Sequence, residues 1–229
     1  YRAEEHNTVR HINEYVSMDL EMGLIHSEQD LIEMETKLLA HIFAYLQETC
    51  EEELKMHEAK IPEFKEIPSV TLEEANAIVK MKTNAKAIAG EQEPEDLDPE
   101  SERILCEHFA AEAGINMVFV THYPWKVRPF YALPEEGSRR SHSFDLLFAG
   151  LEITTGGQRI HQYGQLLEAM ESRGLNPANF ADYLQCFAYG MPPHGGLAIG
   201  LERLVKQLLK LANVREASLF PRDGNRLTP

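Results

Sequence analysis

The stretch SHSFDLLFAGLEITTGG, residues 141–157, decides the fold class of this chain. It is rich in β-branched and aromatic residues, and together with RPFYAL at 128–133 it predicts two or three strands close together in the sequence. Strands joined by short connections pair as antiparallel hairpins. A mainly antiparallel sheet is therefore expected.

Further strands are expected on both sides of this stretch. Residues 10–16 are strand-like around a charged turn, and residues 19–25 alternate polar and apolar side chains as a half-buried strand does. The run NMVFVTHYP at 116–124 predicts a buried strand. Near the C-terminus, GGLAIGLERLVKQLLKL at 195–211 predicts a small-residue strand that leads directly into an amphipathic helix.

Helices are expected in separate segments between these strands. Ser27 and Asp30 match a capping box, and apolar residues then recur at helical spacing to about residue 50. A second helix has an N-cap, a proline at its first position and a glycine just past its end, namely Asp98, Pro99 and Gly114. Shorter helices are expected near 71–80, at about 163–173 and from 176 to about 190.

Hairpin-spaced strands beside segregated helices predict an α+β fold, with an antiparallel sheet flanked by helices. Neither a GxGxxG nor a Walker sequence occurs, so a dinucleotide fold and a P-loop are not supported. We expect one domain over residues 1–229, with a polar and acidic insertion at 57–98, because the pattern of strands and helices resumes directly after it.

The composition limits the kinds of partner. The chain has 229 residues, 43% of them hydrophobic, which suffices for one core. Its 22 basic and 37 acidic residues give a formal charge of −15, which argues against general binding of nucleic acids or anionic membranes. A polyanionic ligand therefore needs a local basic site.

The cysteines and the hydropathy pattern indicate a cytoplasmic setting without a membrane partner. Cys50, Cys106 and Cys186 are widely spaced, form no CxxC pair and lie in apolar helical patterns, which favours buried, reduced thiols. No apolar run approaches the roughly 18 residues that cross a bilayer, and no secretory signal is recognised.

The first residues of the chain offer a candidate phosphate site. Alternation along a strand places Arg2 and Glu4 on one face. A guanidinium suits a phosphate, and a carboxylate beside it accepts a hydrogen bond from an exocyclic amine. For this pair taken alone, surface salt bridges between strands remain the alternative.

The central stretch offers a candidate metal and carboxylate site. Asp145 and Glu152, seven residues apart, supply oxygen ligands for a hard divalent cation together with Thr155. The glycines that follow let the backbone approach a small ligand, and Arg159 can form a fork with a carboxylate. Exposed carboxylates and a turn with a surface arginine are the alternatives.

The stretch PPHGGLAIGLERL, residues 192–204, offers a candidate platform for a flat ligand. Small residues leave one stretch of strand without bulky side chains, and Arg203 in the first turn of the next helix would face it. A guanidinium stacked on an aromatic base there gains about 0.5–2 kcal/mol. Packing of a helix on a small-residue strand is the alternative.

These stretches together resemble the catalytic domain of class II aminoacyl-tRNA synthetases, and most closely aspartyl-tRNA synthetases of the archaeal and eukaryotic type. The resemblance covers essentially the whole chain outside the acidic insertion. It rests on sequences that stand in the family's order, namely YRAEEHNTVRHINEYVSMDLEM, PFY, FDL, GLEITTGGQRIH, YGMPPHGG and LFPRDGNRLTP.

The resemblance implies an ATP site. Arg2 would hold the α-phosphate, Glu4 would accept a hydrogen bond from the adenine amino group, and Tyr15 and Arg203 would stack on the two faces of the adenine. The implied ATP-binding set is Arg2, Glu4, Arg10, His11, Tyr15, Glu152, Gly200 and Arg203. The implied Mg²⁺ set is Asp145, Glu152 and Thr155, with threonine where the family usually has serine.

The resemblance also implies an aspartate site. Arg159 would pair with the side-chain carboxylate, with Gly156 and Gln158 in the same amino-acid-binding set. A fork of donors suits aspartate and rejects the amide of asparagine. The ending FPRDGNRLTP at 220–229 also favours the aspartate branch. His194 would lie near the amino acid, and it is assigned no chemical role.

The implied reaction forms aspartyl-adenylate from aspartate and ATP and then transfers aspartate to tRNA(Asp), with tRNA(Asn) left open as a second acceptor. Arg2, Arg203 and Mg²⁺ would neutralise the charge that develops at phosphorus, with no side-chain nucleophile. Two alternatives remain: an asparaginyl-tRNA synthetase or an asparagine-synthesising paralogue, and a non-catalytic module derived from a synthetase.

The resemblance further implies that the chain begins after the first signature motif and after an anticodon-binding OB-fold. In the family that first motif builds a homodimer interface, so a homodimer is expected of the full-length protein. The chain by itself is expected not to aminoacylate tRNA.

Overall fold

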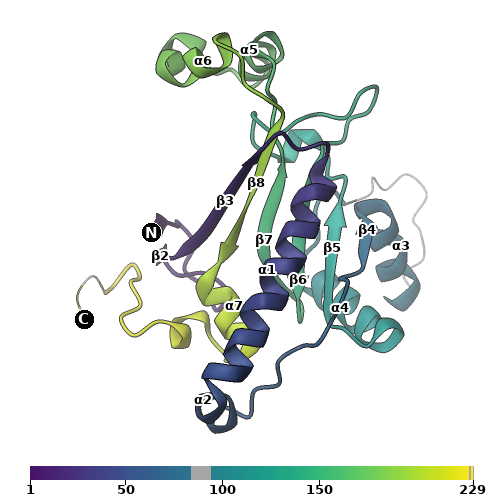
Figure 1. The fold of residues 1–229 in the computed structure, drawn as a ribbon, viewed down its shortest axis with the longest axis vertical. Helices are drawn as coiled ribbons and strands as arrows, with labels where there is room; N and C mark the ends of the chain where they lie inside the picture. Colours follow the sequence, from purple (N-terminus) through teal and green to yellow (C-terminus); the bar gives the residue numbers. More distant parts are fainter. Residues whose placement is uncertain (84–93, 227, 229) are drawn as a thin grey trace.

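A computed structural model describes residues 1–83, 94–226 and 228 of the chain. Its centre is a six-stranded sheet in the order β3-β8-β7-β6-β5-β4, in which only β4 and β5 run parallel (Figure 1). The strands are β3 (Ser17–Gly23), β4 (Ser69–Thr71), β5 (Met117–Thr121), β6 (Ser143–Phe148), β7 (Leu151–Gln158) and β8 (His194–Gly200). The expected α+β fold with a mainly antiparallel sheet is confirmed.

The stretch at 141–157 forms the central hairpin of this sheet. β6 and β7 pair antiparallel around a tight turn at Ala149 and Gly150, and both have positive φ there. All six residues of β6 are buried, because helices cover both faces of the sheet at this point.

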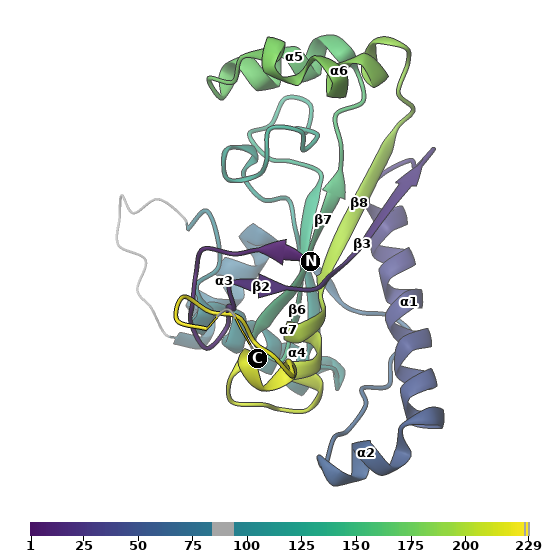
Figure 2. The same cartoon turned by 90° about the vertical axis from the view of Figure 1, so that its left-hand side faces the viewer.

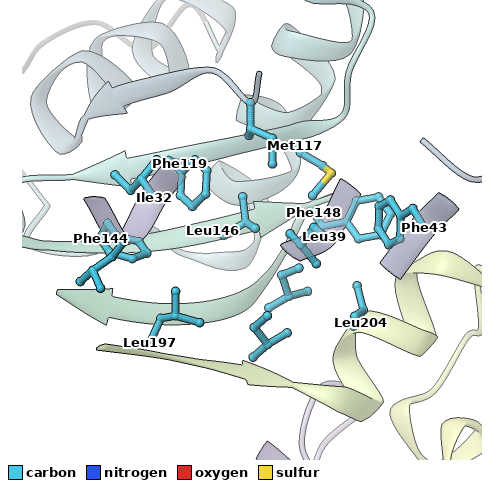
Figure 3. Close-up of a cluster of buried hydrophobic side chains, with 14 of the residues drawn as sticks. Ile32, Leu39, Phe43, Met117, Phe119, Phe144, Leu146, Phe148, Leu197 and Leu204 are labelled. Atoms are coloured by element: carbon cyan, nitrogen blue, oxygen red, sulfur yellow. The ribbon is translucent and has the colours of Figure 1, made fainter. Parts of the chain in front are cut away.

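One face of the sheet packs on the long helix α1 (Glu28–Thr49). Apolar side chains of α1 meet those of β5, β6 and β8 in the main core, which Figure 3 shows in part. Phe43, Phe119, Phe144 and Phe148 are among its largest buried members. The capping box predicted at Ser27 and Asp30 begins this helix.

The opposite face is only partly covered by helices. α3 (Leu72–Thr83) and α4 (Pro99–Ala113) pack on β4, β5 and β6 in a second core. The predicted boundaries of α4 are confirmed, with Asp98 as N-cap and Gly114 in the left-handed region at φ 71°. Within the described part of the chain, the second core contains no residue of β8 or β3, and the N-terminal residues lie over this part of the face (Figure 2).

The N-terminal residues form a small hairpin over that part of the face (Figure 2). β1 (Arg2–Ala3) pairs with β2 (Glu14–Tyr15). The C-terminal segment supports the hairpin, because Val214 N donates to Val9 O at 3.0 Å and Asn13 N donates to Arg222 O at 3.1 Å. This segment follows α7 (Leu201–Leu208) and contains a 3₁₀ helix, η3 (Val214–Ala217).

A helical pair projects beyond one end of the sheet (Figures 1 and 2). It consists of α5 (Tyr163–Ser172), η2 (Pro177–Phe180) and α6 (Ala181–Ala188), and its buried side chains form a third, separate core with residues of the 125–133 segment. Two further short elements are α2 (Glu51–Met56) and η1 (Trp125–Val127). Among the residues that the structure describes, no helix is both long and apolar enough to cross a bilayer.

Several sequence expectations need correction. Residues 128–133 form no strand and contribute only an isolated bridge between Ala132 and Arg159. The strand expected at 10–16 shrinks to two residues, and the helix expected from 176 is a 3₁₀ turn followed by α6. Of the cysteines only Cys106 is buried, whereas Cys186 is exposed.

The segment 57–98 is more closely joined to the domain than its composition suggested. β4 extends the sheet, and Leu72, Ala75 and Leu97 are buried in the second core. Residues 84–93, the middle of the expected insertion, lie outside the described residues.

Candidate active site

A row of paired residues on four neighbouring strands forms one surface of the candidate site. On the face opposite α1, cross-strand pairs join Asp145 of β6 to Thr155 of β7, Thr155 to Ala198 of β8, and Ala198 to Asp19 of β3. Side chains of directly opposed residues lie on the same face of a sheet. Four strands that are distant in sequence thus contribute to one surface.

An irregularity in β7 adds Glu152 to this surface. Leu146 pairs with Thr154 but Leu147 pairs with Glu152, so Ile153 is an extra residue in β7. In a regular strand Glu152 and Thr155, three residues apart, would point to opposite faces. The bulge places both on the face opposite α1.

A cavity of about 180 Å³ lies between this surface and the N-terminal hairpin. All eight residues predicted to bind ATP line it: Arg2, Glu4, Arg10, His11, Tyr15, Glu152, Gly200 and Arg203. They come from β1, the 4–13 loop, β2, β7, β8 and α7.

Arg203 lines this cavity and is held by three hydrogen bonds. Its Nη1 donates to the main-chain oxygen of Glu152 at 2.9 Å and to the Oε1 atom of Glu152 at 3.1 Å. Its Nε donates to the main-chain oxygen of Arg10 at 3.4 Å. Tyr15 lines the same cavity, with the guanidinium carbon of Arg2 5.9 Å from its ring centre.

Two other groups of the cavity have defined protonation tendencies. The main-chain N–H of His6, which donates to Glu4 Oε1 at 2.9 Å, lowers the pKa of the Glu4 carboxyl. Burial, followed by the positive charge of Arg203, lowers the pKa of His11. A carboxylate acceptor and a neutral imidazole are therefore present at neutral pH.

A second cavity of about 640 Å³ adjoins the first. The two share four lining residues, Arg2, Tyr15, Thr155 and Ala198. Arg159 and Gly156, two of the three residues predicted to bind the amino acid, line the second cavity. The three predicted arginines therefore converge: Arg203 lines the first cavity, Arg159 the second, and Arg2 both.

Arg159 is held between a carboxylate and an aromatic ring. Its Nε lies 3.4 Å from Glu21 Oε1, and its guanidinium carbon lies 5.2 Å from the centre of the Tyr131 ring. Both neighbours line the same cavity. The guanidinium keeps further donors for a second carboxylate, since only its Nε is engaged by Glu21.

Gln158 is not brought to either cavity by the structure. It is 6% exposed and is absent from the described residues that line the two cavities. It is the last residue of β7, and its main-chain N–H donates to His142 O at 2.8 Å. The prediction that its side chain binds the amino acid is therefore not supported by this geometry.

At three of the glycine positions, close packing of neighbouring atoms rather than a ligand explains why the residue is glycine. A Cβ atom at Gly156 would lie 2.4 Å from the Phe144 ring, and one at Gly195 would lie 2.7 Å from the main-chain oxygen of Gly157. At Gly196 it would lie 2.0 Å from Glu21 Oε2. Gly200 has room for a Cβ and lines the first cavity, so the predicted platform reduces to Ala198 and Gly200.

The predicted metal ligands separate into two groups. Glu152 and Thr155 line the first cavity, and the Thr155 hydroxyl lies 3.4 Å from Glu152 Oε1. Asp145 is 2% exposed, and both of its oxygens accept hydrogen bonds from Arg128, at 2.9 and 2.6 Å. Asp145 is therefore paired with Arg128 and does not line the first cavity, although each of its oxygens keeps a second lone pair.

Glu152 and Thr155 still supply the hard oxygen donors that Mg²⁺ prefers. Within the described part of the chain, no group of three or more His, Cys, Asp or Glu side chains is arranged as a metal site. Burial, followed by the negative charge of Asp145, raises the pKa of Glu152. An Mg²⁺ ion here would therefore need oxygens of a bound ligand in addition to this pair.

Arg128 lines the second cavity and is not among the predicted site residues. Its guanidinium lies 3.8 Å from the centre of the Tyr123 ring and pairs with Asp145. The residue belongs to RPFYAL, where only a strand was expected. No local pattern in the sequence marks this arginine as buried, because its partner Asp145 lies 17 residues further along the chain.

His194 is the first residue of β8, and its Nδ1 atom lies 3.0 Å from Pro192 O. Its ring centre is 6.0 Å from that of Phe187 of α6. These contacts suit a structural residue.

Comparison with known proteins finds a family model described as "tRNA synthetases class II (D, K and N)", which matches residues 1–224. A curated relative from Deinococcus radiodurans, named aspartate–tRNA(Asp/Asn) ligase, is 50% identical over all of this chain and 53% of its own length. The chain thus spans about half the length of that relative.

Solved structures of tRNA synthetases are also similar to this chain. An aspartyl-tRNA synthetase from Entamoeba histolytica matches with a TM-score of 0.88 and 32% identity, over 100% of this chain and 47% of that one. An asparaginyl-tRNA synthetase from Pyrococcus horikoshii, complexed with asparaginyl-adenylate, matches with a TM-score of 0.86 and 29% identity, over 100% of this chain and 52% of that one.

Proposed function

Since the chain belongs to the class II tRNA synthetases of the D, K and N group, we propose that it is the catalytic part of an aspartate–tRNA ligase. The protein that contains it would activate aspartate with ATP and transfer it to tRNA. The single observation that carries this proposal is the pair of adjoining cavities, one lined by Arg203 and Tyr15, the other by Arg159, with Arg2 between them.

The first cavity suits the nucleotide. Tyr15 and Arg203 offer an aromatic ring and a guanidinium for the two faces of adenine. Glu4 is kept ionised by the His6 N–H and can accept a hydrogen bond from the adenine amino group. Arg2 lines both cavities and would bind the α-phosphate, the atom group that must meet the amino acid.

The second cavity suits aspartate. The free donors of Arg159 would bind the side-chain carboxylate, and Arg128, which is paired with Asp145, lines the same cavity. Asp19 also lines this cavity and offers a negative group for the substrate ammonium. With its side-chain carboxylate and its ammonium group so held, aspartate can present the α-carboxylate toward Arg2.

Adenylate formation then needs alignment rather than a nucleophilic side chain. An oxygen of the aspartate α-carboxylate attacks the α-phosphorus, and the bond from phosphorus to the bridging oxygen of pyrophosphate breaks. Arg2 and Arg203 stabilise the charge that develops on the phosphoryl oxygens. Mg²⁺ would be held by Glu152 and Thr155 and would supply further charge neutralisation at the phosphates.

In the second step, a ribose hydroxyl at the tRNA 3′ end attacks the aspartyl carbonyl and AMP leaves. The name of the Deinococcus radiodurans relative includes both tRNA(Asp) and tRNA(Asn). We therefore take tRNA(Asp) as the partner, with tRNA(Asn) as a second acceptor to be tested. A cytoplasmic location and a homodimer of the full-length protein are parts of the same proposal.

Pyrophosphate exchange tests the proposed reaction. The protein that contains this chain should exchange labelled pyrophosphate into ATP when aspartate is present, and much less when asparagine replaces it. An asparaginyl-tRNA synthetase is the second candidate, because the asparaginyl-tRNA synthetase from Pyrococcus horikoshii matches this chain with a TM-score of 0.86, against 0.88 for the aspartyl-tRNA synthetase from Entamoeba histolytica. Exchange that depends on asparagine would establish that candidate instead.

A further inference from the structure

One residue of α4 reaches the candidate active site from outside the set assigned above. Glu102 lies in the first turn of α4 and is 7% exposed, although it carries a carboxylate. A buried carboxylate loses the hydration that stabilises its charge, so it is rarely kept without partners. The groups that the Glu102 carboxylate contacts indicate its role.

Glu102 contacts two residues of the first cavity. Its Oε2 atom forms an ion pair with Nη2 of Arg10 and accepts a hydrogen bond from the main-chain N–H of Glu152 at 3.3 Å. The side chain of Glu102 is 9% exposed and that of Arg10 is 20% exposed, so water screens this pair only weakly.

These contacts close a circuit around the cavity. Glu102 binds Arg10, the main-chain oxygen of Arg10 accepts from Arg203, Arg203 binds Glu152, and the N–H of Glu152 returns to Glu102. Each member comes from a different element: α4, the 4–13 loop, α7 and β7. The circuit joins the helical half of this face of the sheet to the half that forms the cavity.

We propose that Glu102 is a positioning residue for nucleotide binding, which holds Arg10 and the main chain of Glu152 at the edge of the first cavity. The inference rests on the proposed function for the identity of the ligand, a nucleoside triphosphate. Glu102 does not itself line the cavity and acts through Arg10 and Glu152, which do.

A purely structural role explains the burial less well. The other residues of α4 that are buried with it, Leu105 and Cys106, are apolar or weakly polar and pack in the second core. An apolar side chain at 102 would avoid the desolvation cost of a carboxylate. The other acidic residues that pair within α4, Glu100 and Glu107, bind Arg103 at the surface and leave the cavity untouched.

The test is Glu102→Gln in the protein that contains this chain. The amide is similar in size and can still accept from the N–H of Glu152, but it lacks the charge that binds Arg10. The KM for ATP in aspartate-dependent pyrophosphate exchange should rise about tenfold, because a charged hydrogen bond that orders Arg10 is lost. The KM for aspartate should stay near its wild-type value.

Two further variants separate positioning from general loss of structure. Glu100→Gln removes an exposed carboxylate from the same turn of α4 and should leave the KM for ATP unchanged. In the background of Arg10→Gln, adding Glu102→Gln should raise the KM for ATP no further, since Glu102 acts through Arg10. Should Glu102→Gln not fold, Glu102→Asp keeps the charge and should give an intermediate KM.

An unchanged KM for ATP in folded Glu102→Gln, or equal losses for ATP and aspartate, would overturn the inference. So would two fully additive losses in the double variant. If the wild-type protein shows no aspartate-dependent exchange, the proposed function fails separately. Calorimetric ATP binding by wild type and Glu102→Gln then still tests the positioning role, with a tenfold weaker affinity expected for the variant.

Discussion

In the proposed function, amino-acid selectivity rests on Arg159. Glu21 engages its Nε at 3.4 Å and the Tyr131 ring lies beside it, so the guanidinium is oriented before any substrate arrives. Pre-orientation lowers the entropy lost when a carboxylate binds. Its terminal donors suit a carboxylate better than an amide, because an amide would present N–H donors to a cation.

Arg159→Gln should therefore impair aspartate binding selectively. Loss of charged hydrogen bonds of about 1.5–3 kcal/mol predicts a KM for aspartate raised about 10- to 100-fold in pyrophosphate exchange. The KM for ATP should change little. Arg139→Gln is the matched control, because Arg139 is exposed and lines a different cavity. A normal KM for aspartate in Arg159→Gln would exclude the assignment.

Glu35 is a fully buried carboxyl group in the main core, below β7. The Thr154 hydroxyl donates to its Oε1 at 2.5 Å, while Oε2 has no hydrogen-bond partner among the described residues. Burial raises the pKa of Glu35 from 4.5 to about 8, although the Thr154 bond opposes the shift. The folded protein therefore holds this group neutral at neutral pH.

The pH dependence of stability follows from this shift. Below pH 4.5 the Glu35 carboxyl group is protonated in both the folded and the unfolded chain, so it does not make stability depend on pH. As pH rises from 4.5 toward 8 only the unfolded chain loses this proton, so the free energy of unfolding falls by about 1.4 kcal/mol per pH unit. Glu35→Gln should flatten the loss of melting temperature between pH 5 and pH 8. The exposed variant Glu33→Gln should keep the wild-type slope, and an unchanged slope in Glu35→Gln would contradict the assignment.

At the scale of elements, local signals placed the helices and strands well. The cap residues Ser27 and Asp98 act on their own helices, so sequence alone located both starts. The two-residue β1 and β2 and the bulge at Ile153 depend on contacts between distant segments, which periodicity does not record. The ion pair between Asp145 and Arg128 is likewise a tertiary contact that the spacing of residues in the sequence could not reveal.

The strand β8 offers a matched pair of glycines. At Gly196 a Cβ atom would lie 2.0 Å from Glu21 Oε2 and 2.4 Å from the main-chain oxygen of Leu20, whereas at Gly200 the nearest atoms are 3.7 Å away. Gly196→Ala should destabilise the fold by about 1–3 kcal/mol in denaturant unfolding. Gly200→Ala should keep near-normal stability and instead weaken ATP binding, because Gly200 lines the first cavity. Equal stabilities for the two variants would contradict this account.

For the whole molecule, charge is the dominant property. A net charge of −15 repels a polyanion, yet the proposed substrate includes tRNA. The positive groups of the site, Arg2, Arg159 and Arg203, are committed to small cavities rather than spread over a surface. In the proposed function these arginines bind a nucleotide and an amino acid, whereas strong binding of a folded tRNA needs further phosphate contacts.

The isolated 229-residue chain should accordingly bind tRNA weakly and not aminoacylate it at a measurable rate. Fluorescence anisotropy with labelled tRNA over a salt series should show a small change of log K with log salt concentration, because few phosphates are neutralised. The Deinococcus radiodurans relative, of which this chain covers 53%, is the control and should bind with a steeper salt dependence. Tight, steeply salt-dependent binding by the isolated chain would mean that this acidic domain itself carries an extended phosphate-binding surface.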